Sequence, residues 1–228
     1  MTRIKIAVLL MLGGLVSACG TANVATRNAP FEAQPASAAL TAPAAVADDA
    51  LSTAVPAPTD VSVQDITVRV PRSLTVSEAN RYLPTGDIVW RGDMIGDRYA
   101  QVQAIFETAM QRGTQSLDGT QPVALDIEVK RFHALTEKAR YTVGGVHSIT
   151  FDLTLIDPET GAKLGETRQV RADLDGFGGQ QALRAEAAGL TQKVRITAHL
   201  AEVIRQELTT ADGFKNPQLG FIQAMNGG

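Results

Sequence analysis

Residues 123–130 read VALDIEVK, a stretch in which every second side chain is apolar and most of those between are polar. A period of two is typical of a β-strand with one face in the core and the other in solvent. Residues 148–155, SITFDLTL, repeat the pattern. We expect two neighbouring antiparallel strands, with Val129 opposite Phe151 and Ile127 opposite Leu153 as the register considered.

Further strands are expected before and after this pair in the sequence. Residues 61–70 are rich in β-branched side chains, and their apolar positions change parity, which indicates a β-bulge near 64–65. Residues 88–90 form a short extended piece. DPETG at 157–161 predicts a turn, with Pro after Asp and Gly last. It leads into 162–174, where charged residues interrupt the apolar face, so we expect an irregular edge strand.

Two amphipathic helices are expected to cover the sheet. Residues 97–115 place apolar side chains on one helical face, and Asp97 is a suitable N-cap. Residues 180–208 have a second apolar stripe that Gly189 interrupts only mildly, which predicts one long helix. One or two helical turns are expected over 74–83, where Thr75 and Glu78 have the spacing of a capping box.

These patterns together predict one α+β domain over residues 61–210. Its sheet is expected to be mainly antiparallel, with about four strands and with both main helices packed on one face. The side chains expected beneath the helices are Ile127, Val129, Phe151 and Leu153.

The chain begins with a basic, then apolar, then small-residue segment over residues 1–18, which is typical of a secretory signal. Its apolar run is too short to cross a hydrocarbon core as a helix. VSAC at 16–19 resembles a bacterial lipobox, with Val16 where Leu is more common. That resemblance implies that Cys19 is acylated and becomes the first residue of the mature protein. Because Cys19 is the only cysteine, the domain has no disulfide bond.

Residues 19–60 are rich in Ala and Pro and poor in large apolar side chains, which predicts a flexible tether behind the lipidated cysteine. Residues 211–228 are expected to be a loose tail, with an alternative in which Phe214, Leu219, Phe221 and Ile222 dock. The formal net charge of −3 gives no electrostatic footprint for nucleic acid, so no nucleic-acid partner is expected.

Candidate binding residues lie between the two central strands. Arg140, Tyr141, Gly144 and Gly145 belong to a connection that we interpret as an exposed partner-binding loop. The glycines at 176–179 do not match a dinucleotide fingerprint, so a phosphate site is disfavoured.

No catalytic, metal-binding or cofactor-binding set is recognisable, although two clusters leave an enzyme open. His133 would face His147 at one end of the sheet, where they form either a polar rim of the core or half of a metal site. Asp126, Glu128 and Asp152 share the polar face of the sheet, either as a solvated charged surface or as an acid–base pair.

The sequence from 68 to 208 resembles a family of alphaproteobacterial lipoproteins. The residues behind this resemblance are DIVW at 87–90, GDR at 96–98, Gly144-Gly145 and the DPETG turn. The order of elements is also similar to that of small auxiliary lipoproteins of envelope machines. In proteins that the lipobox resembles, Asp after the cysteine favours the inner membrane, so Gly20 implies an outer-membrane anchor with the domain facing the periplasm.

The function expected from these features is a non-enzymatic adaptor that binds an envelope protein or a wall polymer. The alternative is a periplasmic hydrolase that uses the sheet-end histidines or the carboxylates.

Overall fold

The computed structural model describes residues 59–217. The expected signal at 1–18, Cys19 and nearly all of the tether therefore lie outside the described residues. Leu219, Phe221 and Ile222 of the tail lie outside them as well.

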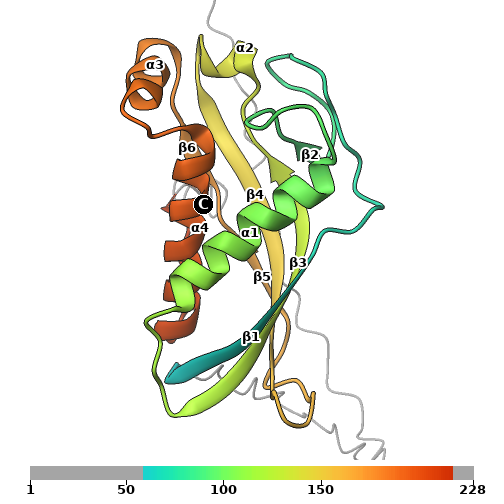
Figure 1. Ribbon diagram of the computed structural model, residues 1–228, viewed down its shortest axis with the longest axis vertical. Helices are drawn as coiled ribbons and strands as arrows, with labels where there is room; N and C mark the ends of the chain where they lie inside the picture. The colour runs from blue at the N-terminus through green and yellow to red at the C-terminus, as the bar shows by residue number, and fades with distance from the viewer. Residues whose placement is uncertain (1–58, 218–228) are drawn as a thin grey trace, which may run out of the picture. The chain divides into compact units, whose positions relative to one another are not determined.

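Two long antiparallel strands form the centre of the sheet, as the alternation predicts (Figure 1). They are β3 (Gln121–His133) and β4 (Gly145–Ile156). Val129 lies opposite Phe151 and Ile127 opposite Leu153, so the expected register is confirmed. All four side chains are buried, at 1% exposure or less, in the core beneath the helices.

Shorter strands pair with both outer edges of this central pair. The bounds of these strands are β1 (Val61–Arg69), β2 (Ile88–Val89), β5 (Arg168–Arg171) and β6 (Leu174–Gly176). β1 and β2 pair with β3, whereas β5 and β6 pair with β4. The bulge in β1 is confirmed, because the pairing with β3 shifts register between Val63 and Asp65.

The α+β class is confirmed, but the sheet is mixed rather than mainly antiparallel. β1 and β2 both run parallel to β3, while β4 runs antiparallel to β3 and to its own outer partners. The chain leaves β1, crosses one face of the sheet through a helix and enters β3 from the same end. That crossover makes the two strands parallel. The alternation of apolar and polar residues does not reveal the direction of a strand, because parallel and antiparallel strands alternate alike.

The first main helix is α1 (Arg98–Thr114), close to its expected bounds. Asp97 is its N-cap and accepts hydrogen bonds from the backbone N–H groups of Tyr99 and Ala100 at 3.0 and 3.2 Å. α1 crosses the second main helix, α4 (Gln192–Thr209), on one face of the sheet (Figure 1). The crossing is close at Gly113, since a Cβ there would lie 2.3 Å from the Ala201 carbonyl oxygen.

The single long helix expected over 180–208 is instead two helices. α3 (Gly179–Ala187) ends before Gly189, whose φ of +78° is left-handed, and α4 starts again after Thr191. The Thr191 hydroxyl accepts a hydrogen bond from the Val194 N–H, as an N-cap does. Gly189 therefore terminates α3 at the position where left-handed glycine is common.

The helix expected over 74–83 is absent, and that segment is irregular. The Thr75 backbone N–H and hydroxyl both donate to Asp87, at 2.9 and 2.7 Å, so Thr75 does not cap a helix. Glu78 instead accepts from the buried Arg98 guanidinium at 2.6 and 3.0 Å. The capping-box spacing thus reflects two long-range contacts. A four-residue helix, α2 (Glu137–Arg140), occurs between β3 and β4.

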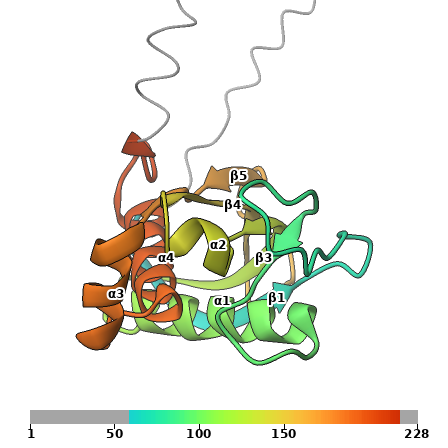
Figure 2. The ribbon, with the colours of Figure 1, turned by 90° about the horizontal axis from the view of Figure 1, so that it is seen from above.

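Four aromatic side chains pack together in the core between the sheet and α1. Trp90 meets Phe132 edge-to-face at 5.6 Å, and Phe106 of α1 meets Phe151 in the same way at 5.5 Å. All four rings are fully buried. This cluster fixes α1 and β2 against the end of the sheet where α2 and α3 also lie (Figures 1 and 2).

Candidate functional site

The expected binding loop follows α2 and turns the chain into β4. Gly144 and Gly145 have φ values of +74° and +150°, conformations that side chains other than glycine rarely adopt. Gly144 also packs against backbone, because a Cβ there would lie 2.8 Å from the Gly176 carbonyl oxygen and 2.9 Å from the Gly178 nitrogen. The loop is therefore seated on the connection between β6 and α3. Gly178 allows this close approach, because a Cβ there would lie 2.3 Å from the Gly144 nitrogen, whereas a Cβ at Gly176 would instead meet the Leu135 side chain at 2.3 Å.

The two side chains expected to bind a partner are joined to α3. The Arg140 guanidinium donates to the Tyr141 hydroxyl at 3.1 Å, and that hydroxyl donates to Glu186 at 3.2 Å. Arg140 Nε also lies 3.2 Å from a Glu186 carboxylate oxygen. The structure thus brings Arg140, Tyr141 and the two loop glycines together at one place, and α3 forms the other side of it.

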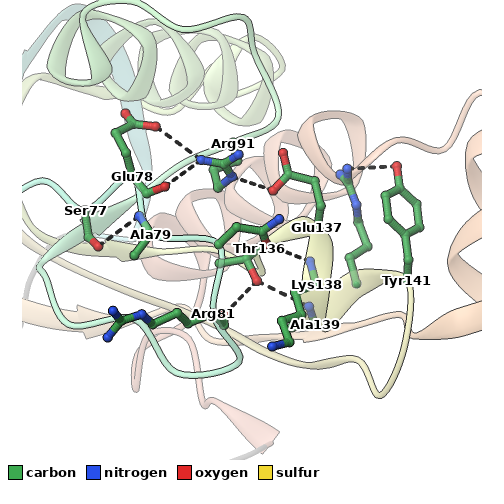
Figure 3. A network of polar contacts seen from close by, with 12 residues as sticks. Ser77, Glu78, Ala79, Arg81, Arg91, Thr136, Glu137, Lys138, Ala139 and Tyr141 are labelled. Atoms are coloured by element: carbon green, nitrogen blue, oxygen red, sulfur yellow. Dashed lines mark hydrogen bonds and ion pairs between the residues drawn. The ribbon is translucent and has the colours of Figure 1, made fainter.

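A second network holds α2 from the opposite side (Figure 3). The Arg91 guanidinium pairs with Glu137 and donates to the Glu78 carbonyl oxygen at 2.7 Å. The Thr136 hydroxyl donates to the Arg81 carbonyl oxygen at 2.7 Å, across 55 residues of sequence. These contacts fix α2, so the 140–145 loop that follows it has a defined position.

A small pocket of about 10 Å³ opens between this loop, the start of α4 and α3. Its polar lining comes from Arg140, His147, Glu186, Gln192 and Arg195, and Phe177 and Leu190 are among its apolar residues. Sequence reasoning missed Gln192 and Arg195, because both lie at the break in what was expected to be one continuous helix. The left-handed glycine at that break was the available signal.

The pocket is electropositive. Burial, and then the charges of Arg195 and Arg140, lower the pKa of His147 to about 3, so this histidine is neutral at physiological pH. The His147 Nδ1 accepts a hydrogen bond from the Leu135 N–H at 3.2 Å, which leaves the ring proton on Nε2. The charged groups of the lining are the guanidinium groups of Arg140 and Arg195 and the carboxylate of Glu186, so the lining has a net positive charge.

His133 does not face His147, contrary to the expectation. The β3–β4 pairing shifts register between Val129 and Arg131, so His133 lies opposite Ser148. This second bulge, at Lys130, turns His133 to the face away from the core, while His147 stays on the core face. The His133 Nδ1 lies 2.6 Å from the Arg131 guanidinium instead. Across residues 59–217, no group of three or more His, Cys, Asp or Glu side chains could hold a metal ion.

The carboxylates of the sheet face form a charged surface with basic partners. Arg69 pairs with Asp126 and with Glu128, and Lys130 pairs with Glu128 and lies 3.2 Å from Asp152. Lys130, and then Arg69, lower the pKa of Glu128 despite its partial burial. An acid–base pair would need one carboxyl with a raised pKa, whereas the pKa of Glu128 is lowered.

The segment expected as an irregular edge strand is indeed irregular. It makes an isolated bridge at Lys163, then β5, then β6, and the Asp173 carboxylate accepts the Ile149 N–H at 2.9 Å between the two strands. Its outer edge is partly occupied, since the Asn216 side chain donates to the Arg171 carbonyl oxygen and Arg168 pairs with Glu207. Phe214 packs against the core beside His199.

Comparison with known families places this fold in a defined group. A family of unknown function, DUF6778, matches residues 61–224. The chain belongs to this family. The match covers the sheet, both main helices and the 140–145 loop, so the whole candidate site belongs to the DUF6778 domain.

Solved structures resemble the DUF6778 domain only distantly. A candidate lipoprotein from Caulobacter crescentus is 15% identical, with a TM-score of 0.31 over 63% of this chain and 88% of its own. A DUF330 protein from Xanthomonas campestris is 10% identical, with a TM-score of 0.38 over 75% of this chain and 90% of its own. The PelC dodecamer from Paraburkholderia phytofirmans is 15% identical, with a TM-score of 0.26 over 65% and 93%. No curated protein matched the sequence.

Within the part of the chain that the structure describes, no helix has the length and apolar character needed to cross a membrane.

Proposed function

We propose that this protein is a lipid-anchored adaptor of the bacterial envelope that binds a partner protein and carries out no reaction of its own. The observation behind the proposal is a surface made of the 140–145 loop and α3, here called the loop–α3 surface. It is built by the Arg140–Tyr141–Glu186 contacts and fixed from behind by α2.

Exposed apolar side chains on and beside the loop–α3 surface support a role in protein binding. Val143 is 75% exposed at the loop tip, and Leu183 and Leu190 are 45% and 50% exposed on and just after α3. Val146 and Val194 are each 43% exposed nearby. Apolar side chains that a folded domain leaves in water beside a defined polar pocket are typical of a protein-binding site.

The anchor and the location rest on the sequence. The lipobox-like residues 16–19 support acylation of Cys19 in a bacterial envelope, and Gly20 supports the outer membrane with the domain in the periplasm. Intact-mass measurement of the protein purified from envelopes tests the anchor. A Cys19→Ser variant that is processed and fractionates with membranes like the wild type would contradict it.

Complementation of a deletion strain tests the adaptor. Val143→Asp places a charge at the loop tip, where the side chain is exposed and the fold does not depend on it, so abundance should stay normal while complementation fails. Leu83→Asp is the matched control, because Leu83 is 89% exposed on a different segment. Failure of both variants or of neither would contradict a specific role for the loop–α3 surface.

The same assay separates an adaptor from an enzyme. Alanine at His133, Asp126 or Glu128 should leave complementation intact, whereas removal of residues 22–58 should abolish it because the domain no longer reaches its partner. If one of these three side chains proves essential in a variant of normal abundance while the tether proves irrelevant, the adaptor proposal gives way to the hydrolase alternative.

A further inference from the structure

The side chain of Gln192 is an unexplained polar group in the pocket of the loop–α3 surface. Gln192 is only 4% exposed, and neither its amide nitrogen nor its amide oxygen has a hydrogen-bond partner. A buried amide without partners costs free energy comparable to lost hydrogen bonds. Gln192 therefore points to a ligand that supplies a hydrogen-bond acceptor to its NH₂ group.

The charges around Gln192 define the accepting group as an anion. Arg195 donates to the Asp175 carbonyl oxygen at 2.7 Å and stacks on the Phe177 ring at 3.4 Å. Within residues 59–217, no carboxylate forms an ion pair with Arg195, although Arg195 has a longer-range electrostatic interaction with Asp175. Arg140 is paired with Glu186, yet its Nε hydrogen has no well-aligned hydrogen-bond acceptor.

The size of the pocket decides what kind of molecule presents that anion. About 10 Å³ admits a group the size of one water molecule, whereas pockets for small-molecule ligands are on the order of 300–1,000 Å³. Only the tip of a side chain enters such a space, and the rest of the ligand must lie outside on the apolar residues around it. Leu190 lines the pocket and is itself half exposed.

We propose that this pocket receives the carboxylate of an acidic side chain from the partner protein, an inference that rests on the proposed function. One oxygen of that carboxylate enters the pocket, where it accepts a hydrogen bond from the Gln192 amide near the Arg140 and Arg195 charges, and the other oxygen stays at the pocket mouth. Leu190 and its exposed neighbours cover the residues on either side of that acid.

The test is a titration of the full-length processed protein in detergent micelles, followed by NMR of the glutamine side-chain amides. The probe is the peptide acetyl-Ala-Glu-Ala-amide, with acetyl-Ala-Gln-Ala-amide as its uncharged counterpart. The Gln192 resonances are assigned by their loss in Gln192→Ala. We expect them to shift with the Glu peptide, with a Kd on the order of 1 mM, and the Gln peptide to bind about tenfold more weakly.

Two arginine variants provide the matched pair. Arg195→Gln removes the charge beside the pocket and should weaken the Glu peptide about tenfold. Arg184→Gln makes the same change on the exposed side of α3, outside the pocket lining, and should leave the affinity unchanged. Arg195→Lys retains the charge and should therefore keep most of the wild-type affinity for the Glu peptide.

Unshifted Gln192 resonances at about 10 mM Glu peptide, or equal shifts from the Glu and Gln peptides, would overturn the proposal and leave the pocket with water only. That failure is separable from failure of the adaptor. If Val143→Asp still fails to complement, the loop–α3 surface binds its partner by other contacts. If Val143→Asp complements, the adaptor itself is wrong.

Discussion

Replacement of Gly113 by alanine sets two effects of opposite sign against each other at the crossing of α1 and α4. In an exposed helix the change would stabilise the fold by about 0.8–1 kcal/mol, because alanine is the better helix former. Here the new methyl group would lie 2.3 Å from the Ala201 carbonyl oxygen and 2.4 Å from the Ile204 Cγ2. Real Cβ atoms do not come this close to other atoms, so α4 has to move.

The cost of that movement should exceed the gain. The first obstacle is backbone of α4, which cannot turn aside as a flexible side chain would, and overpacking of a dense core costs about 1–3 kcal/mol. We expect Gly113→Ala to lower the free energy of unfolding by about 1–2 kcal/mol in net. For a domain of this size the midpoint temperature should fall by about 2–4 °C per kcal/mol.

Urea unfolding followed by circular dichroism measures this change, with Gln111→Ala as the control on the exposed face of α1. The control should be neutral or slightly stabilising. A Gly113→Ala protein that is as stable as the wild type, or more stable, would refute the close crossing of the two helices.

Three further changes test other parts of the fold. Phe151→Asp should abolish cooperative unfolding because it buries an unpaired charge. Asp126→Ala on the charged face should lower the free energy of unfolding by less than about 1 kcal/mol. Equal effects of the two variants would mean that the core face is wrongly assigned. Gly144→Ala should destabilise more than Gly161→Ala, since their φ values are +74° and +72° but only Gly144 has backbone within 3 Å of the added methyl group; equal losses in thermal unfolding would contradict the seated loop. In the folded protein His147 stays neutral down to about pH 3, whereas in the unfolded chain it is protonated below about pH 6.5. The free energy of unfolding should therefore decrease as the pH is lowered from about 6.5 to about 3, by up to about 1.4 kcal/mol per pH unit. A His147→Gln variant whose stability depends on acid pH as steeply as that of the wild type would contradict the burial of His147.

The central strands were predictable from sequence because their alternation is local and strict. The same is true of α1, where Asp97 lies next to the helix it caps. The direction of β1 was not predictable in this way, since parallel and antiparallel strands alternate alike. It follows from the α1 crossover, which is a property of the connection rather than of the strand.

The candidate site was predictable only in part. Arg140 and Tyr141 were recognised because they lie in the connection between two predicted strands, next to a pair of glycines. Gln192 and Arg195 were not, because their role depends on the break at Gly189, which a helical stripe conceals. The bulge at Lys130 was missed for a related reason: it changes the face of every residue after it, yet the sequence there remains compatible with an unbroken strand.

Site-specific photocrosslinking in intact cells tests partner binding through the loop–α3 surface most directly. The photoreactive residue is placed at Val143 and at Leu183, with Glu159 in the exposed 157–161 turn as the control. We expect an adduct of one discrete mass from Val143 and Leu183, which is absent from Glu159 and is lost when Val143→Asp is combined with the Leu183 probe. The same adducts from all three positions, or none from either position on the loop–α3 surface, would contradict it.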